Sequence, residues 1–174
     1  MANPLDPVMQ WYKAASDSMR VTQRVLTKGI KAAITAKHVF YKKPVVDCEA
    51  LLVTAKEELD RLVVLGLTAI FERTLRDYLV QYTRTALPPG DSHRDAVREE
   101  MIEDIEFWNV SSRVVEVFPA VDANIRGQAK QVIDYRNWVA HGHTLAKPAT
   151  SKVVPDKAYQ VLTEFLLQAG VITP

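Results

Sequence analysis

The sequence predicts an all-α protein, a single up-and-down helical bundle of four to five main helices that spans residues 1–174 as one domain. Apolar residues recur every three or four positions over several long segments, which is the period of a helix that buries one face. Turn-forming residues separate these segments, most clearly at Leu87–Asp91. The β-prone stretch 109–119 has no partner strand elsewhere, so we expect a short helical turn there rather than an isolated strand.

The first two helices are expected at residues 7 to about 40 and at residues 47–84. Pro7 suits the first turn of a helix, where its missing N–H costs nothing. Pro44 ends the first segment, because the residue before a proline is pushed out of the helical region. Asp47 is then placed to cap the second helix.

Charged residues replace the apolar stripe of the second helix near its C-terminal end. Glu72 with Arg76 and Arg73 with Asp77 have the spacing of ion pairs on a helix surface. Such pairs are usually solvated and contribute little to stability. A stripe that turns polar can also approach a functional site, and both interpretations stay open.

Three further helices are expected over residues 92–108, from about residue 120 to Gly142, and from Pro155 to Gly170. Ser92 stands where the first of these begins, directly after the turn. Asp122 lies near the start of the second, where an acidic residue suits the helix dipole. The fold class and the number of helices therefore follow from periodicity and turn residues alone.

Composition is that of an ordinary globular protein, with 48% hydrophobic and 25% charged residues. No apolar run approaches the roughly 18 to 20 residues that cross a bilayer, and residues 1–10 do not resemble a secretory signal. We therefore expect no membrane span and a cytoplasmic location. The single cysteine, Cys48, is expected to be a buried thiol, and no metal or cofactor is expected, because ligand spacing and a glycine-rich phosphate loop are missing.

Charge is distributed unevenly along the chain. Residues 1–45 carry eight Lys or Arg against two acids, a net of +6, whereas the whole chain has +1. A basic segment of this kind either binds nucleic acid or forms a solvated helix face. The acidic segment 92–108 is either solvated or opposed to the basic first helix, within one protomer or across a dimer.

Residues 134–143, DYRNWVAHGH, contain more side chains suited to catalysis than any other stretch of similar length in the sequence. Arg136 is a permanent cation, Asn137 both donates and accepts hydrogen bonds, and His141 carries a proton near neutral pH. These side chains suit phosphodiester chemistry without a metal ion.

The string RNWVAHG resembles the signature of the HEPN superfamily, in which an Arg, four to six residues and a His lie near the end of a long helix in an all-α bundle. Four residues separate Arg136 from His141 here, and Ala140 and Gly142 match the fuller form of the motif. The resemblance implies a metal-independent RNA endonuclease with a composite active site at a homodimer interface. It also implies a toxin or antiviral defence effector, with an antitoxin or other partner protein.

Helix geometry constrains this site. Asn137 and His141 lie about 40° apart on a helical wheel and one turn apart in height, so the amide is expected to reach the imidazole. Arg136 and His141 lie about 140° apart, which is awkward on one straight helix. Gly142 suggests that the helix ends there, and a second copy related by a two-fold axis offers another solution.

In the reaction that the resemblance implies, the 2′-hydroxyl of the RNA attacks the neighbouring phosphate. His141 is the candidate general base or acid, and Arg136 neutralises the crowded phosphorane. Asn137 orients His141 or binds a phosphate oxygen, and Glu72 is a candidate polar support. Tyr135 and His143 are candidate RNA contacts. The structural alternative is that Arg136 pairs with a buried carboxylate and that His141 caps the helix C-terminus, where a cation is favoured.

A function of another class competes with the ribonuclease. The same groove suits a non-catalytic binding or assembly module for a nucleotide or for a partner protein such as a nucleotidyltransferase. Turnover of RNA in EDTA separates the two hypotheses, because only the nuclease cleaves. A metal-dependent hydrolase is disfavoured by the missing ligand spacing.

Overall fold

The computed structural model describes residues 2–29, 37–141 and 152–173, and every regular element in these ranges is helical. The predicted all-α class is confirmed. Five α-helices and one π-helical turn follow one another in the described part of the chain. None of these helices is both long and apolar enough to cross a membrane.

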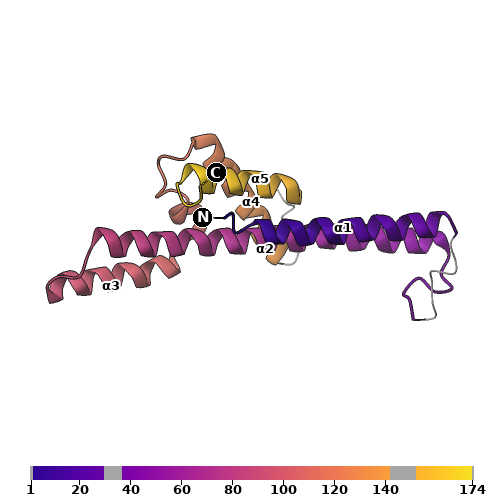
Figure 1. The fold of residues 1–174 in the computed structure, drawn as a ribbon, viewed down its shortest axis with the longest axis horizontal. Helices are drawn as coiled ribbons and strands as arrows, with labels where there is room; N and C mark the ends of the chain where they lie inside the picture. Colours follow the sequence, from indigo (N-terminus) through magenta and orange to yellow (C-terminus); the bar gives the residue numbers. More distant parts are fainter. Residues whose placement is uncertain (1, 30–36, 142–151, 174) are drawn as a thin grey trace.

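The longest helix, α2 (Val45–Ala86), organises the molecule. Its 42 residues correspond to about 63 Å at 1.5 Å per residue, and it runs along almost the whole length of the protein (Figure 1). Helix α1 (Asp6–Thr27) packs antiparallel against its N-terminal part. Met9, Tyr12 and Ser16, three or four residues apart, form the buried face of α1, so the two helices make a long hairpin.

The boundary between the first two helices differs from the expected one. Helix α1 ends at Thr27 rather than near residue 40, because Gly29 adopts a positive φ of 66°, a conformation that ends a right-handed helix. Helix α2 begins two residues earlier than expected, after Pro44, and no side chain caps it. Asp47 is therefore not the N-cap but lies in the first turn, where its charge still suits the helix dipole.

Helix α3 (Ser92–Phe107) runs back along the C-terminal part of α2 (Figure 1). Its predicted start at Ser92 is confirmed, and Asp91 caps it by accepting a hydrogen bond from the backbone N–H of Arg94 at 2.9 Å. Ile105 is its one buried residue, so the acidic face is solvated. Helices α1 and α3 contact opposite ends of α2 and do not touch each other within the described residues. The acidic helix thus does not oppose the basic first helix within one protomer.

The β-prone stretch is helical, as expected, and forms a π-helical turn, η2 (Val110–Val114). Val114, Val115 and Phe118 of this stretch are buried in the main core, whereas Val117 is exposed, so most of its apolar residues pack in the core without forming a strand. Helix α4 (Ala123–Ala140) follows, capped by Asp122, whose carboxylate accepts from the N–H groups of Asn124 and Ile125. Helix α5 (Pro155–Gln168) completes the fold.

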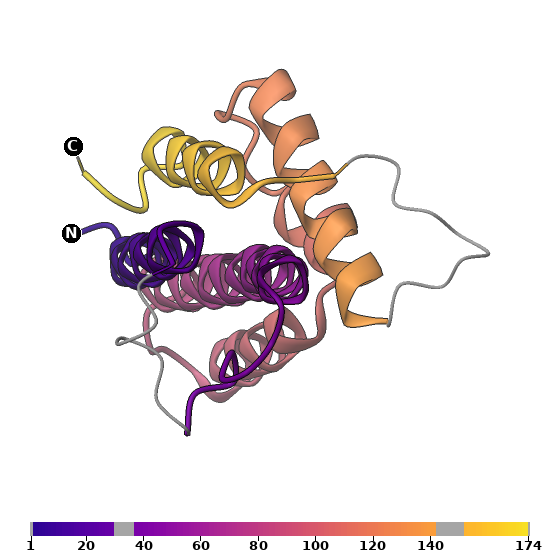
Figure 2. The same ribbon diagram turned by 90° about the vertical axis from the view of Figure 1, so that its right-hand side faces the viewer.

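Helices α4 and α5 lie together on one side of the long hairpin, as the end-on view shows (Figure 2). Both contact α2 and each other, and the main hydrophobic core forms where they meet. Phe165 at the centre of this core contacts Phe71 and Phe118 edge-on, with ring centroids 5.2 and 5.7 Å apart. This packing determines where α4, and with it the RNWVAHG motif, lies relative to α2.

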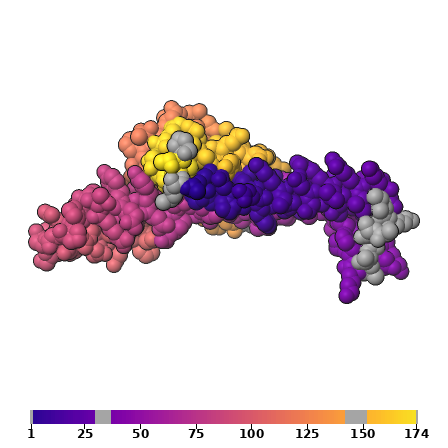
Figure 3. Space-filling view, viewed as in Figure 1, coloured from indigo at the N-terminus to yellow at the C-terminus, as the bar shows by residue number. Residues whose placement is uncertain are grey.

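The far end of the α1–α2 hairpin projects away from this core (Figure 3). A small separate cluster of Leu26, Phe40 and Cys48 packs there. The thiol of Cys48 is buried, as expected.

Candidate functional site

Arg136 is held in place by two hydrogen bonds where α4 crosses α2. Its Nη2 donates to Oε2 of Glu72 at 3.2 Å, and its Nη1 donates to Oδ1 of Asn137 at 2.9 Å. The Glu72 side chain is 14% exposed and that of Arg136 is 28% exposed. Sixty-four positions separate these two residues in the chain, so the contact depends on the packing of α4 on α2. The guanidinium is therefore fixed in a partly buried position.

Glu72 is an unusual partner because burial opposes its charge. Its Oε1 is inaccessible to solvent and has no hydrogen-bond partner among the described residues. Burial raises the pKa of the Glu72 carboxyl above the ordinary 4.5, although the Arg136 and Arg76 guanidinium groups act in the opposite direction. The structure thus places a carboxylate where desolvation outweighs its favourable charge interactions.

This pKa shift predicts a pH dependence of stability. The folded protein binds the Glu72 proton more tightly than the unfolded chain does, so the contribution of Glu72 to stability falls as the pH rises above about 4.5. We expect the free energy of unfolding of Glu72→Gln to rise relative to that of the wild type over this range. Urea unfolding of both proteins at several pH values between about 4 and 7 measures the difference.

Glu100→Gln, on the solvent-facing side of α3, controls for the loss of one negative charge. The prediction would be contradicted if the free energy of unfolding of Glu72→Gln, relative to that of the wild type, did not change or fell as the pH rises.

The expected ion pair between Glu72 and Arg76 is not formed, and this corrects the sequence-based expectation. Arg76 instead donates to the carbonyl of Ile105 at 2.8 Å and to that of Trp108 at 3.0 Å. These carbonyls lie at the C-terminal end of α3, where a helix leaves acceptors unpaired and a cation is favoured. The other expected pair, Arg73 with Asp77, is present at 2.7 Å on the surface.

A small polar cleft of about 230 Å³ surrounds the Arg136 guanidinium. Its walls come from α2, α4 and the segment that joins α3 to η2; they are lined by Glu72, Arg76, Trp108, Asn109, Val110, Ser111, Ile133, Arg136 and Asn137. Two guanidinium groups face one carboxylate in this lining, which gives it a net positive charge. Such a lining favours an anion of phosphate size.

The sequence did not place three of these residues, Arg76, Asn109 and Ser111, at the candidate site; Arg76 was expected only in a surface ion pair with Glu72. Asn109 accepts from the Ser112 N–H at 3.0 Å and from the Ser111 hydroxyl at 3.1 Å, so it caps η2. An Asn with serines two and three positions later, as at Asn109, Ser111 and Ser112, is a capping signal. That signal predicts a helix start, but not that the start lies beside Arg136.

His141 terminates α4, which agrees with a helix that ends at the motif. Its backbone N–H donates to the carbonyl of Asn137 at 3.0 Å, and its side chain is exposed. It does not line the Arg136 cleft. The expected contact between the Asn137 amide and the imidazole is not formed in the described residues; the Asn137 oxygen accepts a hydrogen bond from Arg136. The cleft therefore contains Arg136 and Asn137 of the motif but not His141.

Tyr135 does not occupy the position expected of an RNA contact. It is 5% exposed and packs in the main core, with its ring stacked on Trp138 at 5.8 Å. Burial raises the pKa of the Tyr135 hydroxyl. In this conformation its ring is inaccessible to a nucleic acid. The other candidate contact, His143, lies outside the described residues, as does Gly142.

Within the described ranges, no three His, Cys, Asp or Glu side chains are grouped so that they could hold a metal ion. Comparison of the chain with protein-family models, with curated proteins and with solved structures found no match. The fold and the site together define an all-α protein with a small, positively charged cleft at the crossing of α2 and α4.

Proposed function

We propose that the protein is an endoribonuclease that cleaves RNA without a metal ion, with Arg136 and His141 as its catalytic residues. One observation carries the proposal: the Arg136 guanidinium is fixed by Glu72 and Asn137 in a polar cleft, and an exposed His141 ends the same helix. The resemblance of RNWVAHG to the HEPN signature supports the same function.

Arg136 is suited to bind the reacting phosphate. A guanidinium carries five N–H donors, and Glu72 and Asn137 each accept one of them. The remaining donors are available to non-bridging phosphate oxygens, whose negative charge grows in the phosphorane. Because Glu72 and Asn137 already orient the guanidinium, little reorganisation is needed when the phosphate binds.

His141 is suited to move the proton of the reaction. The 2′-oxygen of the RNA forms a bond to phosphorus while the bond from phosphorus to the 5′-oxygen breaks. A neutral imidazole takes the 2′-proton, and a protonated imidazole gives a proton to the departing 5′-oxygen. The products are a 2′,3′-cyclic phosphate and a 5′-hydroxyl end. No water or metal ion takes part in this step.

The proposal includes a homodimer. Arg136 lines the cleft and His141 does not, so one chain does not bring both groups into the cleft. Two copies related by a two-fold axis would place His141 of one copy beside the cleft of the other. Each complete site would then combine residues of both subunits.

Incubation of the purified protein with a mixed RNA substrate in excess EDTA tests the proposed activity. We expect cleavage, with cyclic phosphate ends identified by mass spectrometry of the fragments. RNA that stays intact, or cleavage that EDTA abolishes, would overturn the proposal.

A second candidate function is a non-catalytic module that binds a nucleotide or a partner protein. It is favoured by the position of His141 outside the cleft and by the two hydrogen bonds that Arg136 already makes. The cleft volume of about 230 Å³ is below the roughly 300 to 1,000 Å³ of typical small-molecule sites, so the cleft would hold the phosphate group of a nucleotide and leave its base outside. Calorimetric titration with AMP and ATP, with no turnover, would support this alternative.

A further inference from the structure

The projecting end of the α1–α2 hairpin is strongly basic. We call this surface the arm tip and define it as the described residues 20–29 and 37–49 (Figure 1). Its cations are Arg20, Arg24, Lys28, Lys37, Lys42 and Lys43, and its acids are Asp47 and Glu49. Among these cations only Arg20 forms an ion pair with a described residue, Asp17 at 2.8 Å. Five positive charges at the arm tip therefore have no carboxylate partner among the described residues.

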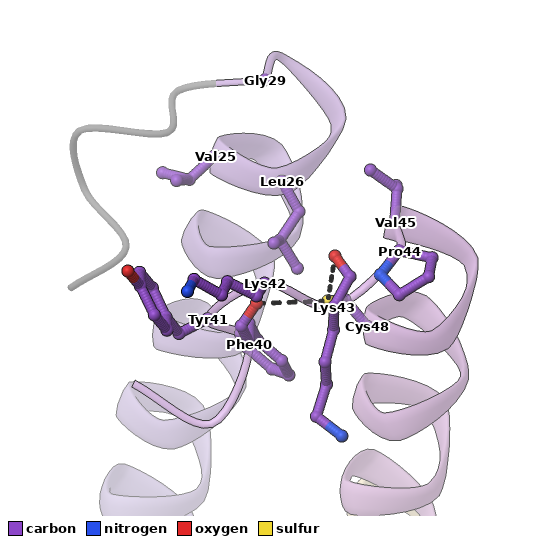
Figure 4. A pocket seen from close by; sticks show the side chains of 10 residues that line it. All are labelled: Val25, Leu26, Gly29, Phe40, Tyr41, Lys42, Lys43, Pro44, Val45 and Cys48. Atoms are coloured by element: carbon purple, nitrogen blue, oxygen red, sulfur yellow. Dashed lines mark hydrogen bonds between the residues drawn. The ribbon is translucent and has the colours of Figure 1, made fainter. Parts of the chain in front are cut away.

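An apolar cavity of about 520 Å³ opens among these charges (Figure 4). Leu26, Phe40 and Cys48, all buried, form part of its lining. Tyr41 also lines the cavity, is 42% exposed, and carries the Lys42 ammonium group 5.2 Å from its ring centroid. An accessible aromatic ring thus lies next to two consecutive lysines.

This combination fits a single-stranded nucleic acid. Proteins bind single strands by stacking bases on aromatic side chains while cations follow the phosphates. A nucleobase is flat and largely apolar, so the Tyr41 ring and the cavity can accept it, and Lys42 and Lys43 can contact the adjacent phosphates. The acidic α3 lies at the opposite end of α2 and does not neutralise these charges.

We propose that the arm tip is a second RNA-binding surface, which holds a single-stranded part of the substrate away from the Arg136 cleft. Glu72 in the cleft lies 27 positions after Val45 at the arm tip along α2, which corresponds to about 40 Å of helix. The identity of the ligand as substrate rests on the proposed function. RNA binding at the arm tip does not require cleavage.

The separation makes the contribution of the arm tip depend on RNA length. A strand of four nucleotides is too short to bridge about 40 Å, because a stacked strand advances about 3.4 Å per nucleotide and even roughly twice that rise gives less than about 30 Å. A strand of 30 nucleotides can contact both surfaces. Binding far from the reacting phosphate is equal in the ground state and the transition state, so it lowers KM without changing kcat.

Fluorescence anisotropy with a labelled 30-nucleotide 2′-O-methyl polyuridine tests the proposal, because this RNA lacks the attacking hydroxyl and stays intact. We expect Lys42→Gln/Lys43→Gln to weaken binding about tenfold and to reduce the slope of log affinity against log salt by about 1.4, or 0.7 per phosphate contact. Tyr41→Ala is expected to weaken binding about fivefold through lost stacking. Lys13→Gln/Lys157→Gln, which removes two exposed lysines outside the arm tip, is the matched control and should bind as the wild type does.

Affinity of the arm-tip variants equal to that of the wild type would overturn the proposal, as would an equal loss in the control variant. Loss of binding to phosphatidylserine vesicles with RNA affinity unchanged would also overturn it and would assign the arm tip to a membrane surface.

In cleavage assays, the lysine variant should raise KM for 30-nucleotide RNA and leave KM for four-nucleotide RNA unchanged. If RNA binds at the arm tip but is not cleaved, only the proposed nuclease function is contradicted. If RNA is cleaved and the lysine variant leaves KM unchanged, only the arm-tip proposal is contradicted.

Discussion

Replacing His141 by alanine is expected to slow RNA cleavage by about 10²- to 10⁴-fold, the usual contribution of a general acid or base. The fold should tolerate the change. The His141 side chain is exposed, and its contact with α4 comes from its backbone N–H, which alanine keeps. We expect the free energy of unfolding to change by less than about 0.5 kcal/mol. Cleavage rates in EDTA and urea unfolding of the same preparations measure both quantities.

His93→Ala is the matched control, because His93 is an exposed histidine on α3, far along the chain from the motif. It should cleave RNA at the wild-type rate. Cleavage by His141→Ala at the wild-type rate would remove His141 from the mechanism, and with it the proposed reaction.

Mixing two inactive variants extends this prediction to the composite site. If Arg136 of one subunit acts with His141 of the other, a heterodimer of Arg136→Ala and His141→Ala chains contains one intact site and one doubly defective site. Random exchange of subunits should then restore about one quarter of the wild-type activity. If both residues act within one chain, no activity returns. Light scattering that shows only monomers at micromolar concentration would also contradict the composite site.

Replacing Phe165 by alanine is expected to lower the free energy of unfolding by about 3 to 5 kcal/mol. The ring is fully buried and contacts Phe71 of α2 and Phe118 beside η2 edge-on. Its removal leaves a cavity where α2, α5 and the segment before α4 meet. A loss of this size is a large part of the roughly 5 to 15 kcal/mol that stabilises a typical domain.

Phe107→Ala is a matched control, because it deletes the same side chain from a position that is 89% exposed. It should change stability by less than about 0.5 kcal/mol. Equal losses in the two variants, measured by urea unfolding, would contradict the assignment of Phe165 to the centre of the core.

Local signals in the sequence were sufficient for most of the helices. Turn residues and caps act over a few positions, so Ser92, Asp122 and Pro155 mark helix starts that the structure confirms. The predicted first helix is too long because the helical spacing of apolar residues continues past Gly29, whose positive φ ends the helix. Asp47 is of a residue type that commonly caps helices, but the N-cap of α2 is Pro44, which fixes the backbone conformation before the helix.

Less of the candidate site than of the helical fold could be predicted from the sequence. Helical spacing predicts an ion pair between Glu72 and Arg76, which are four residues apart. In the structure Glu72 instead accepts a hydrogen bond from Arg136 of α4, and Arg76 donates to the carbonyl of Ile105 of α3. A buried carboxylate and the carbonyl groups at a helix end hold a guanidinium more strongly than a solvated neighbour on the same helix does. The burial of Tyr135 likewise depends on which face of α4 meets the core.

The sequence by itself determined the all-α class, the order of the helices and the position of the RNWVAHG motif at a helix end, because periodicity, turns and caps are properties of neighbouring residues. Only the tertiary structure decided that Arg136 forms a hydrogen bond with Glu72, that Arg76 donates to carbonyl groups at the end of α3, and that His141 lies outside the cleft. It also placed the basic arm tip and the acidic α3 at opposite ends of α2. These outcomes depend on how helices far apart in the chain pack, and residue spacing along one helix does not encode that packing.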